Sequence, residues 1–259
     1  MRRLIVEDPV SRPAVWAARV GLVALAAFAF SAILTRTSRL DLDGGLAALA
    51  ASAGLALVAL ALALLAFVRI WMHGHRGFGI ALGGVALAAL VLAYPAAIGA
   101  RSAIRPPVFD VSTDLESAPA FATTPSVVAA RGGWRGAAAD PGLRARQRAE
   151  ATRIAPLVVE LPEDTAFSLA LTAAADIGMQ VLESVPPGEE REAGTIDGRT
   201  TTLLLRLPVE IAVRVRPSGE GARVDVRAVS RAPVDDLGGP TETVRAFLAA
   251  FEERRREGM

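Results

Sequence analysis

The sequence predicts three N-terminal transmembrane helices followed by a soluble α+β domain with an antiparallel sheet packed by helices. Three long apolar runs fill the first hundred residues, and no comparable run follows Ala100. The second half instead contains a strand pair of period two and a helix with one apolar stripe, which together indicate a sheet covered by helices. We therefore expect a transmembrane region at residues 1–100, a linker and peripheral extended segment at 101–140, and the α+β domain at 141–259.

The apolar runs have the length of membrane spans. Leu46–Val68 and Phe78–Ala100 each hold 23 residues without a charge. As helices they extend about 34 Å, enough to cross a hydrocarbon core of about 30 Å. The first run contains Arg19 near its start, where an arginine can reach the headgroups. We expect spans at about 14–34, 46–68 and 78–100.

Two alternatives to these spans stay open. The first run has a short uncharged stretch with small residues around Ala27–Ala32, so a cleaved signal peptide is an alternative there. The other two runs are alternatively buried helices of a globular protein. We disfavour this because soluble helices rarely stay apolar on every face for such a length.

Arginine counts on the two sides of the spans predict the orientation. The N-terminal flank and the second loop carry six arginines, whereas the first loop and the segment after the third span carry four. Cytoplasmic segments are enriched in arginine, so we expect a multi-pass protein of the cell inner membrane with a cytoplasmic N-terminus and a periplasmic C-terminal domain. Cleavage of the first segment would leave the domain outside, because two crossings from an external N-terminus also end outside.

Composition excludes several classes of partner and site. The chain has 28 Arg and no Lys, which we interpret as the nucleotide bias of a GC-rich bacterium. After residue 100 there are 20 Arg and 23 acidic residues, a net charge near −3. A nucleic-acid partner would require a positive excess, so we expect none. The absence of cysteine excludes a disulfide framework and thiolate metal sites.

Periodicity and turn residues predict the first elements of the domain. The segment 101–140 is rich in Pro and Gly, and we expect it to run over the domain with its aromatic residues in the surface. A helix opened by Pro162 ends at Gly178. We also expect a helix at 144–154 and strands at 156–161, 179–184, 192–196 and 200–207, the last two joined by a turn at Asp197-Gly198.

The clearest element is a hairpin at residues 209–229. Val209, Ile211 and Val213 alternate with polar residues, and the same alternation follows a turn at 217–221. Period two predicts one buried face and one solvent-exposed face, the latter a ladder of Arg, Asp and Glu in cross-strand pairs. Pro240 then opens a final helix, whose apolar stripe is Val244, Phe247, Leu248 and Phe251.

Two segments carry a resemblance to a known family. "VDVRAVSR" at Val224–Arg231, followed by "DDLGGPTETVRAFLAAF" at Asp235–Phe251, resembles the domain-of-unknown-function family 1499, and "DVSTDLESAPAF" at Asp110–Phe121 is similar to its N-terminal signature. The resemblance covers roughly residues 104–251. It implies a fold and, for several members, preceding membrane spans. It implies no activity, because the family has no settled one.

Three positions depart from the pattern of that family. Val209-Glu210 stands where paired aspartates are usual, Ala228 replaces a serine, and Gly239-Pro240 replaces an asparagine-alanine pair. If these positions form a site in the family, this chain has lost part of it.

The available side chains restrict catalysis. From residue 101 onward the sequence has no His, Lys, Cys or Tyr, which excludes a catalytic triad, a Schiff-base lysine and a His-ligated metal within the domain. His73 and His75 are too few ligands for a metal. We expect no cofactor and favour a non-catalytic domain. The alternatives are an envelope hydrolase that uses Asp235 and Asp236, and a purely structural envelope protein.

A binding site is the remaining functional hypothesis. Arg227 and Arg231, beside Ser230 and Asp235, are placed to clamp an anionic small molecule, or an envelope partner, bidentately. The competing interpretation of the arginines is a solvated ladder of ion pairs with Glu210 and Arg214. For Asp236 and Gly238 we expect a structural turn or cap. The expected partners are thus the lipid bilayer and one of these ligands.

Overall fold

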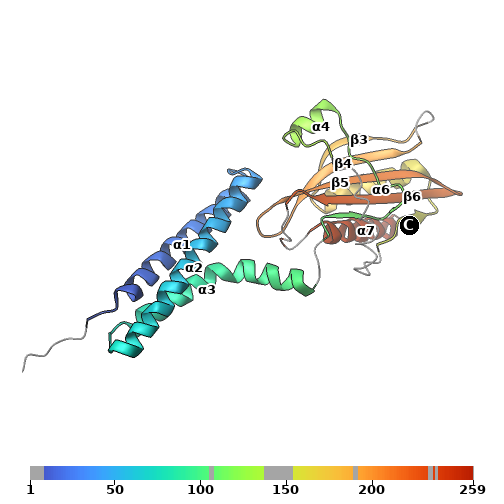
Figure 1. Cartoon of the computed structure of the whole chain (residues 1–259). Coiled ribbons are helices and arrows are strands. Elements are labelled where there is room, and N and C mark those ends of the chain that lie inside the picture. The colour runs from blue at the N-terminus through green and yellow to red at the C-terminus, as the bar shows by residue number, and fades with distance from the viewer. Residues whose placement is uncertain are drawn as a thin grey trace, which may run out of the picture. The chain divides into compact units, whose positions relative to one another are not determined.

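The chain divides into two compact units, Met1–Ile104 and Arg105–Met259. A computed structural model describes residues 9–104, 108–136, 154–188, 192–232, 236 and 239–258. The helix predicted at 144–154 lies, except for its last residue, outside the described residues. Figure 1 shows the helices of the first unit and the sheet of the second.

The first unit contains the three predicted apolar helices. They are α1 (Arg12–Arg36), α2 (Leu42–His73) and α3 (Phe78–Ile104). All three are long and apolar enough to cross a membrane. Each extends beyond the predicted apolar run, because the helix continues through flanking residues such as Arg36, Arg69 and Arg101. α3 contains Pro95 and changes direction along its length in Figure 1, as a proline inside a helix predicts.

Small residues form the contacts between these helices. A Cβ atom placed on Gly84 of α3 would lie 2.9 Å from the backbone carbon of Ala17 in α1, so the two backbones approach closely. Large apolar side chains point outward instead, with Phe30 64% and Leu64 57% exposed. Small residues inside and large apolar residues outside are the distribution expected of helices in lipid, and this indicates membrane anchoring.

The second unit is built on one antiparallel sheet, which confirms the α+β class. Its strand order is β1-β6-β5-β4-β3, and β2 also pairs with β6. The strands are β1 (Asp110–Ser112), β2 (Leu157–Val159), β3 (Gln180–Val185), β4 (Gly194–Thr201), β5 (Pro208–Ser218) and β6 (Gly221–Ser230). The helices are α4 (Pro125–Ala130), α6 (Glu163–Asp176) and α7 (Pro240–Glu257).

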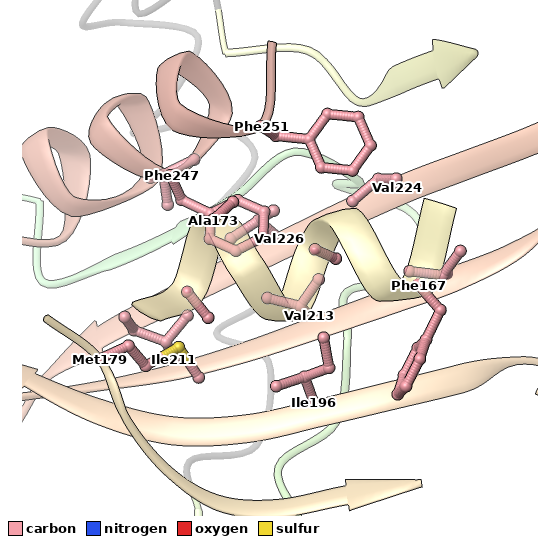
Figure 2. Packing of buried hydrophobic residues seen from close by; sticks show 14 of the residues in the cluster. Phe167, Ala173, Met179, Ile196, Ile211, Val213, Val224, Val226, Phe247 and Phe251 are labelled. Atoms are coloured by element: carbon pink, nitrogen blue, oxygen red, sulfur yellow. The ribbon is translucent and has the colours of Figure 1, made fainter. Parts of the chain in front are cut away.

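The apolar face of the sheet packs against α6 and α7. Phe167 of α6 and Phe247 and Phe251 of α7 lie over the valine and isoleucine side chains of β4, β5 and β6, as Figure 2 shows. The alternating residues of the predicted hairpin and the stripe of the predicted last helix therefore meet in one core. Both predictions are confirmed.

The predicted turn at Asp197-Gly198 is wrong. β4 runs without interruption from Gly194 to Thr201, and both residues pair with β3 and β5. Gly198 serves a different purpose. A Cβ atom at this position would collide with the carbonyl oxygen of Gln180 in β3, so glycine permits the close approach of the two strands at a register shift.

The prediction of a solvent-exposed sheet face is also wrong. Glu210 and Asp225 are 0% exposed and Arg227 is 3% exposed, although all three alternate with the core residues. The segment 108–136 covers this face: its strand β1 pairs with β6, and side chains farther along it contact β4 and β5. Periodicity distinguishes the two faces of a strand but does not reveal that a distant segment covers the polar one.

Candidate functional site in the charged face of the sheet

The covered face of the sheet holds a network of ion pairs, which is the candidate functional site. Its side chains come from β1, β4, β5 and β6 and from the covering segment. We divide it into the Arg131 cluster, the Arg227–Asp110 pair and the Asp114 cluster. The Arg131 cluster consists of Arg131, Asp197, Arg199, Glu210 and Arg231, and the Asp114 cluster of Asp114, Arg214, Arg216, Arg223 and Asp225.

Arg131 lies at the centre of its cluster. It follows α4, and its side chain is 0% exposed. Its Nε donates to Glu210 Oε2 at 2.9 Å, and its Nη2 donates to Asp197 Oδ1. Arg199 binds the other oxygen of Glu210 at 2.9 Å. One buried arginine therefore joins the covering segment to both β4 and β5.

Burial raises the pKa of Asp197 to about 6. Removal of the carboxylate from water, with repulsion from Glu210, outweighs the hydrogen bond from the Ala122 amide and the charge of Arg131, which act in the opposite direction. The pKa of Asp197 is thus above the ordinary range of an aspartate, so this carboxyl group ionises at a higher pH than usual. Because it is paired on both oxygens, it has the properties of a structural group and not of a free catalytic acid.

Two aromatic side chains separate the ionic groups. The guanidinium carbons of Arg131 and Arg227 lie 5.3 and 5.1 Å from the ring centre of Phe121. Trp134 packs edge-on against this ring at 5.1 Å and lies 5.9 Å from Arg231. These cation–π contacts let the covering segment bury arginines beside apolar surface. Phe121, one of the aromatic residues expected to lie against the domain, is 7% exposed and packs with Ala212 and Val229.

The Asp114 cluster gathers three arginines around one carboxylate oxygen. Asp114 Oδ2 lies 3.2 Å from Arg214 Nη2, 2.9 Å from Arg216 Nη2 and 3.1 Å from Arg223 Nη2. Asp225 forms ion pairs with the same three side chains. Three cations therefore share two anions, and the cluster retains a net positive charge.

The pKa of Asp114 is lowered, in contrast to that of Asp197. Burial opposes its ionisation, but amide hydrogen bonds from Ser117 and Glu116 and the charges of Arg223 and Arg214 outweigh this effect. Asp114 is consequently a fixed anion at neutral pH. It holds the arginines together despite their mutual repulsion.

The described residues of the predicted clamp have different binding partners in the structure. Arg227 is bound through two hydrogen bonds, of 2.9 and 2.7 Å, to Asp110 and is almost fully buried. Arg231 is half-buried and donates to the Arg131 carbonyl at 2.9 Å. The Ser230 hydroxyl bonds to the Ala232 carbonyl. Asp235 lies outside the described residues. Of these residues, Arg231 is the cation that stays accessible.

Asp236 is buried and holds the β4–β5 loop. Its Oδ2 accepts hydrogen bonds from the Thr202 hydroxyl at 2.5 Å and from the Leu205 amide at 2.7 Å. The acceptor role expected of this carboxylate is present, and these two partners belong to the β4–β5 loop. Gly238 lies outside the described residues.

Sequence reasoning missed Arg131 and Asp114. Both lie in the segment predicted as peripheral, where no periodic pattern indicates which side chains face inward. A signal does exist for Asp114, because it falls inside the "DVSTDLESAPAF" signature. Within the described ranges, no group of three or more His, Cys, Asp or Glu side chains is arranged to hold a metal ion.

The match to a known family covers this whole arrangement. The family described as "Protein of unknown function (DUF1499)" matches residues 110–251. The chain belongs to this family. The DUF1499 region begins with β1 and ends within α7, so it includes the covering segment, the charged face and both core helices. No curated protein and no solved structure matches the chain.

Proposed function

We propose that the chain is an inner-membrane protein whose C-terminal domain lies in the periplasm and binds an anionic small molecule without catalysis. The orientation rests on the arginine bias of the loops, with six arginines on the proposed cytoplasmic side and four on the other. The binding function rests on the Asp114 cluster. The single observation that carries it is the presence of three arginines on two carboxylates at a partly exposed position.

The geometry of this cluster suits an anion with two or more oxygens. Arg216 and Arg223 are directly opposite each other in the β5–β6 register. Their side chains are 32% and 28% exposed, so both guanidinium groups reach solvent while Asp114 and Asp225 fix them from inside. Like charges at opposed positions cost free energy, and a bound phosphate or carboxylate would remove that cost.

A second feature favours the same position. The buried Nε of Arg214 has no hydrogen-bond acceptor among the described residues. A buried donor without a partner destabilises a fold unless water or a ligand satisfies it. The proposal therefore places the ligand at the hairpin, on the side of Arg214, Arg216 and Arg223. The proposed site does not include Arg227 of the predicted clamp, because the guanidinium group of Arg227 is already bound to Asp110.

The proposal is tested by ligand-dependent stabilisation of the full chain in nanodiscs. Inorganic phosphate, compared with sodium chloride at equal ionic strength, is expected to raise the melting temperature of the wild type. The double variant Arg216→Gln/Arg223→Gln should lose this increase. The control Arg254→Gln/Arg255→Gln removes two arginines from α7 and should retain it.

Equal stabilisation of all three proteins by phosphate would contradict the proposed anion site. An envelope partner, the other binding hypothesis, would instead be found by crosslinking in membranes. In that case the hairpin variant would lose a specific crosslinked protein without showing any phosphate effect.

A further inference from the structure

The β4–β5 loop exposes two adjacent leucines. Leu203 is 69% and Leu204 is 40% exposed. Among the other large apolar residues in the described part of the second unit, only Val158 and Val181 have comparable exposure. Two neighbouring leucines in water are unfavourable, so this loop requires an explanation other than folding.

Buried side chains and hydrogen bonds fix the conformation of the β4–β5 loop. Leu205 and Leu207 are buried, at 5% and 1% exposure, and anchor the loop in the domain. Asp236 binds the Thr202 hydroxyl and the Leu205 amide, and the same hydroxyl accepts the Leu207 amide. The exposed leucines are therefore presented on a fixed backbone, and little conformational entropy is lost when they are covered.

The loop lies at the end of the sheet where the chain enters the domain. Thr201 pairs with Pro208, which begins β5, and the next residue, Val209, pairs with Ser230 at the end of β6. The Ser230 amide in turn donates to the carbonyl of Phe109, just before β1. Three strand spacings, about 14 Å in all, separate the first strand from the fourth in this order.

The connection to the last apolar helix is short. α3 ends at Ile104, and the described domain resumes at Val108. Four residue steps span at most about 14 Å even when fully extended. If α3 crosses the bilayer, this length of chain limits the distance of Val108 from the end of that helix to about 14 Å. Phe109 and the β4–β5 loop lie at the sheet end that follows Val108.

We propose that Leu203 and Leu204 insert into the interfacial layer of the bilayer. Exposed Arg206 follows them with a positive φ of 55° and supplies a cation for lipid phosphates. Two apolar side chains beside a cation are the elements of an interfacial anchor. The loop is a second lipid contact of the domain, in addition to the covalent tether. It depends on the membrane anchoring and not on the anion site.

The test uses single-cysteine labels in the full chain, which has no native cysteine. Leu203→Cys, labelled with the fluorophore NBD and reconstituted in phosphatidylcholine vesicles with anionic lipid, should be quenched about twofold by lipids carrying a doxyl group near the headgroup, as expected for interfacial insertion. The matched control is Val158→Cys, an exposed valine at the opposite end of the sheet, which should not be quenched.

Two outcomes would overturn the insertion. Quenching at position 203 no greater than at position 158 would show that the loop stays in water. A blue-shifted label without quenching by doxyl lipids would show that protein covers the loop instead. The additional substitution Leu204→Glu beside the label should abolish quenching, whereas Leu204→Ile should preserve it.

Discussion

Arg131 compensates two buried carboxylates with one cation. Its side chain is fully buried, and Asp197 and Glu210 are nearly so. Such a group contributes little as an isolated interaction, but its removal leaves Asp197 without its counter-charge and removes one of the cations that bind Glu210, in a medium of low polarity. This makes Arg131 the residue of the charged face with the largest expected effect on stability.

We expect Arg131→Met to lower the free energy of unfolding by about 3–5 kcal/mol, the usual cost of breaking a buried ion pair. Urea unfolding of the full chain in mild detergent would measure it. Arg231→Met removes the same charge from a side chain that is 26% exposed, and should cost about 1 kcal/mol or less. Equal losses in the two variants would contradict the central position of Arg131.

Asp197 should make stability depend on pH. Its pKa is about 6 in the folded chain, against an ordinary value of 3.8, so the folded state binds more protons between these values. Its contribution to stability is therefore greatest below about pH 4 and is lost as the pH rises through 6. The full effect is on the order of 3 kcal/mol.

The check is the difference in unfolding free energy between the wild type and Asp197→Asn, measured from pH 4 to pH 7. The wild type should lose stability relative to the variant across this range. Asp114 has a lowered pKa, so its contribution has the opposite sign and is lost only as the pH falls below its ordinary range. A difference that does not change with pH would contradict the assignment.

At this scale the sequence predicted the types of residue and not their surroundings. Alternation placed Glu210, Asp225 and Arg227 on one face of the hairpin, and the structure confirms that they share it. It could not predict their burial, because their partners Arg131, Asp114 and Asp110 come from a segment without periodicity. The alternation of residues along a strand predicts which face is polar, but it does not predict which segment covers that face.

At the scale of elements, close packing of α1 on α3 depends on glycine. Gly84 faces Ala17, whereas its neighbour Gly83 has no atom within 4 Å of where a Cβ would be. The two glycines have the same helical backbone and differ in what surrounds them. They are therefore a matched pair for testing the packing of the apolar helices.

We expect Gly84→Ala to destabilise the helix bundle by about 1–3 kcal/mol, the usual cost of overpacking. Gly83→Ala should be neutral or stabilising, because alanine favours the helix over glycine. Loss of helical circular dichroism during titration with dodecyl sulfate would measure both. Two variants with the same sign and size of effect would be inconsistent with the described contact.

Long elements were predicted better than short ones. The apolar runs have a strong signal in their length, the β5–β6 hairpin has one in its period-two alternation, and their structures follow these signals. The composition of Asp197-Gly198 predicts a tight turn, and hence two strands, where the structure has β4 alone. The β3–β4 contact requires glycine for another reason, namely the space taken by the Gln180 backbone. Local composition cannot distinguish these two uses of glycine.

At the scale of the whole molecule, the number of crossings decides on which side of the membrane the domain lies. Alkaline phosphatase fused after Met259 should be active, because this enzyme matures only outside the cytoplasm, and green fluorescent protein at the same position should stay dark. Both fusions in the loop after His73 should give the reverse result. Fluorescence from the fusion after Met259 would contradict the proposed orientation and, with it, the periplasmic ligand.

The chain separation of the ionic partners has a consequence for the order of folding. Arg227 and Asp110 are 117 residues apart, Arg214 and Asp114 are 100 apart, and Arg131 and Glu210 are 79 apart. During synthesis the covering segment is made first, and its charged side chains stay hydrated until the later strands have been made. Closing such long loops is slow, and the β5–β6 ribbon, whose contacts are local, is the natural nucleus. We therefore expect the salt bridges to form last, when the early segment closes over a sheet that already exists.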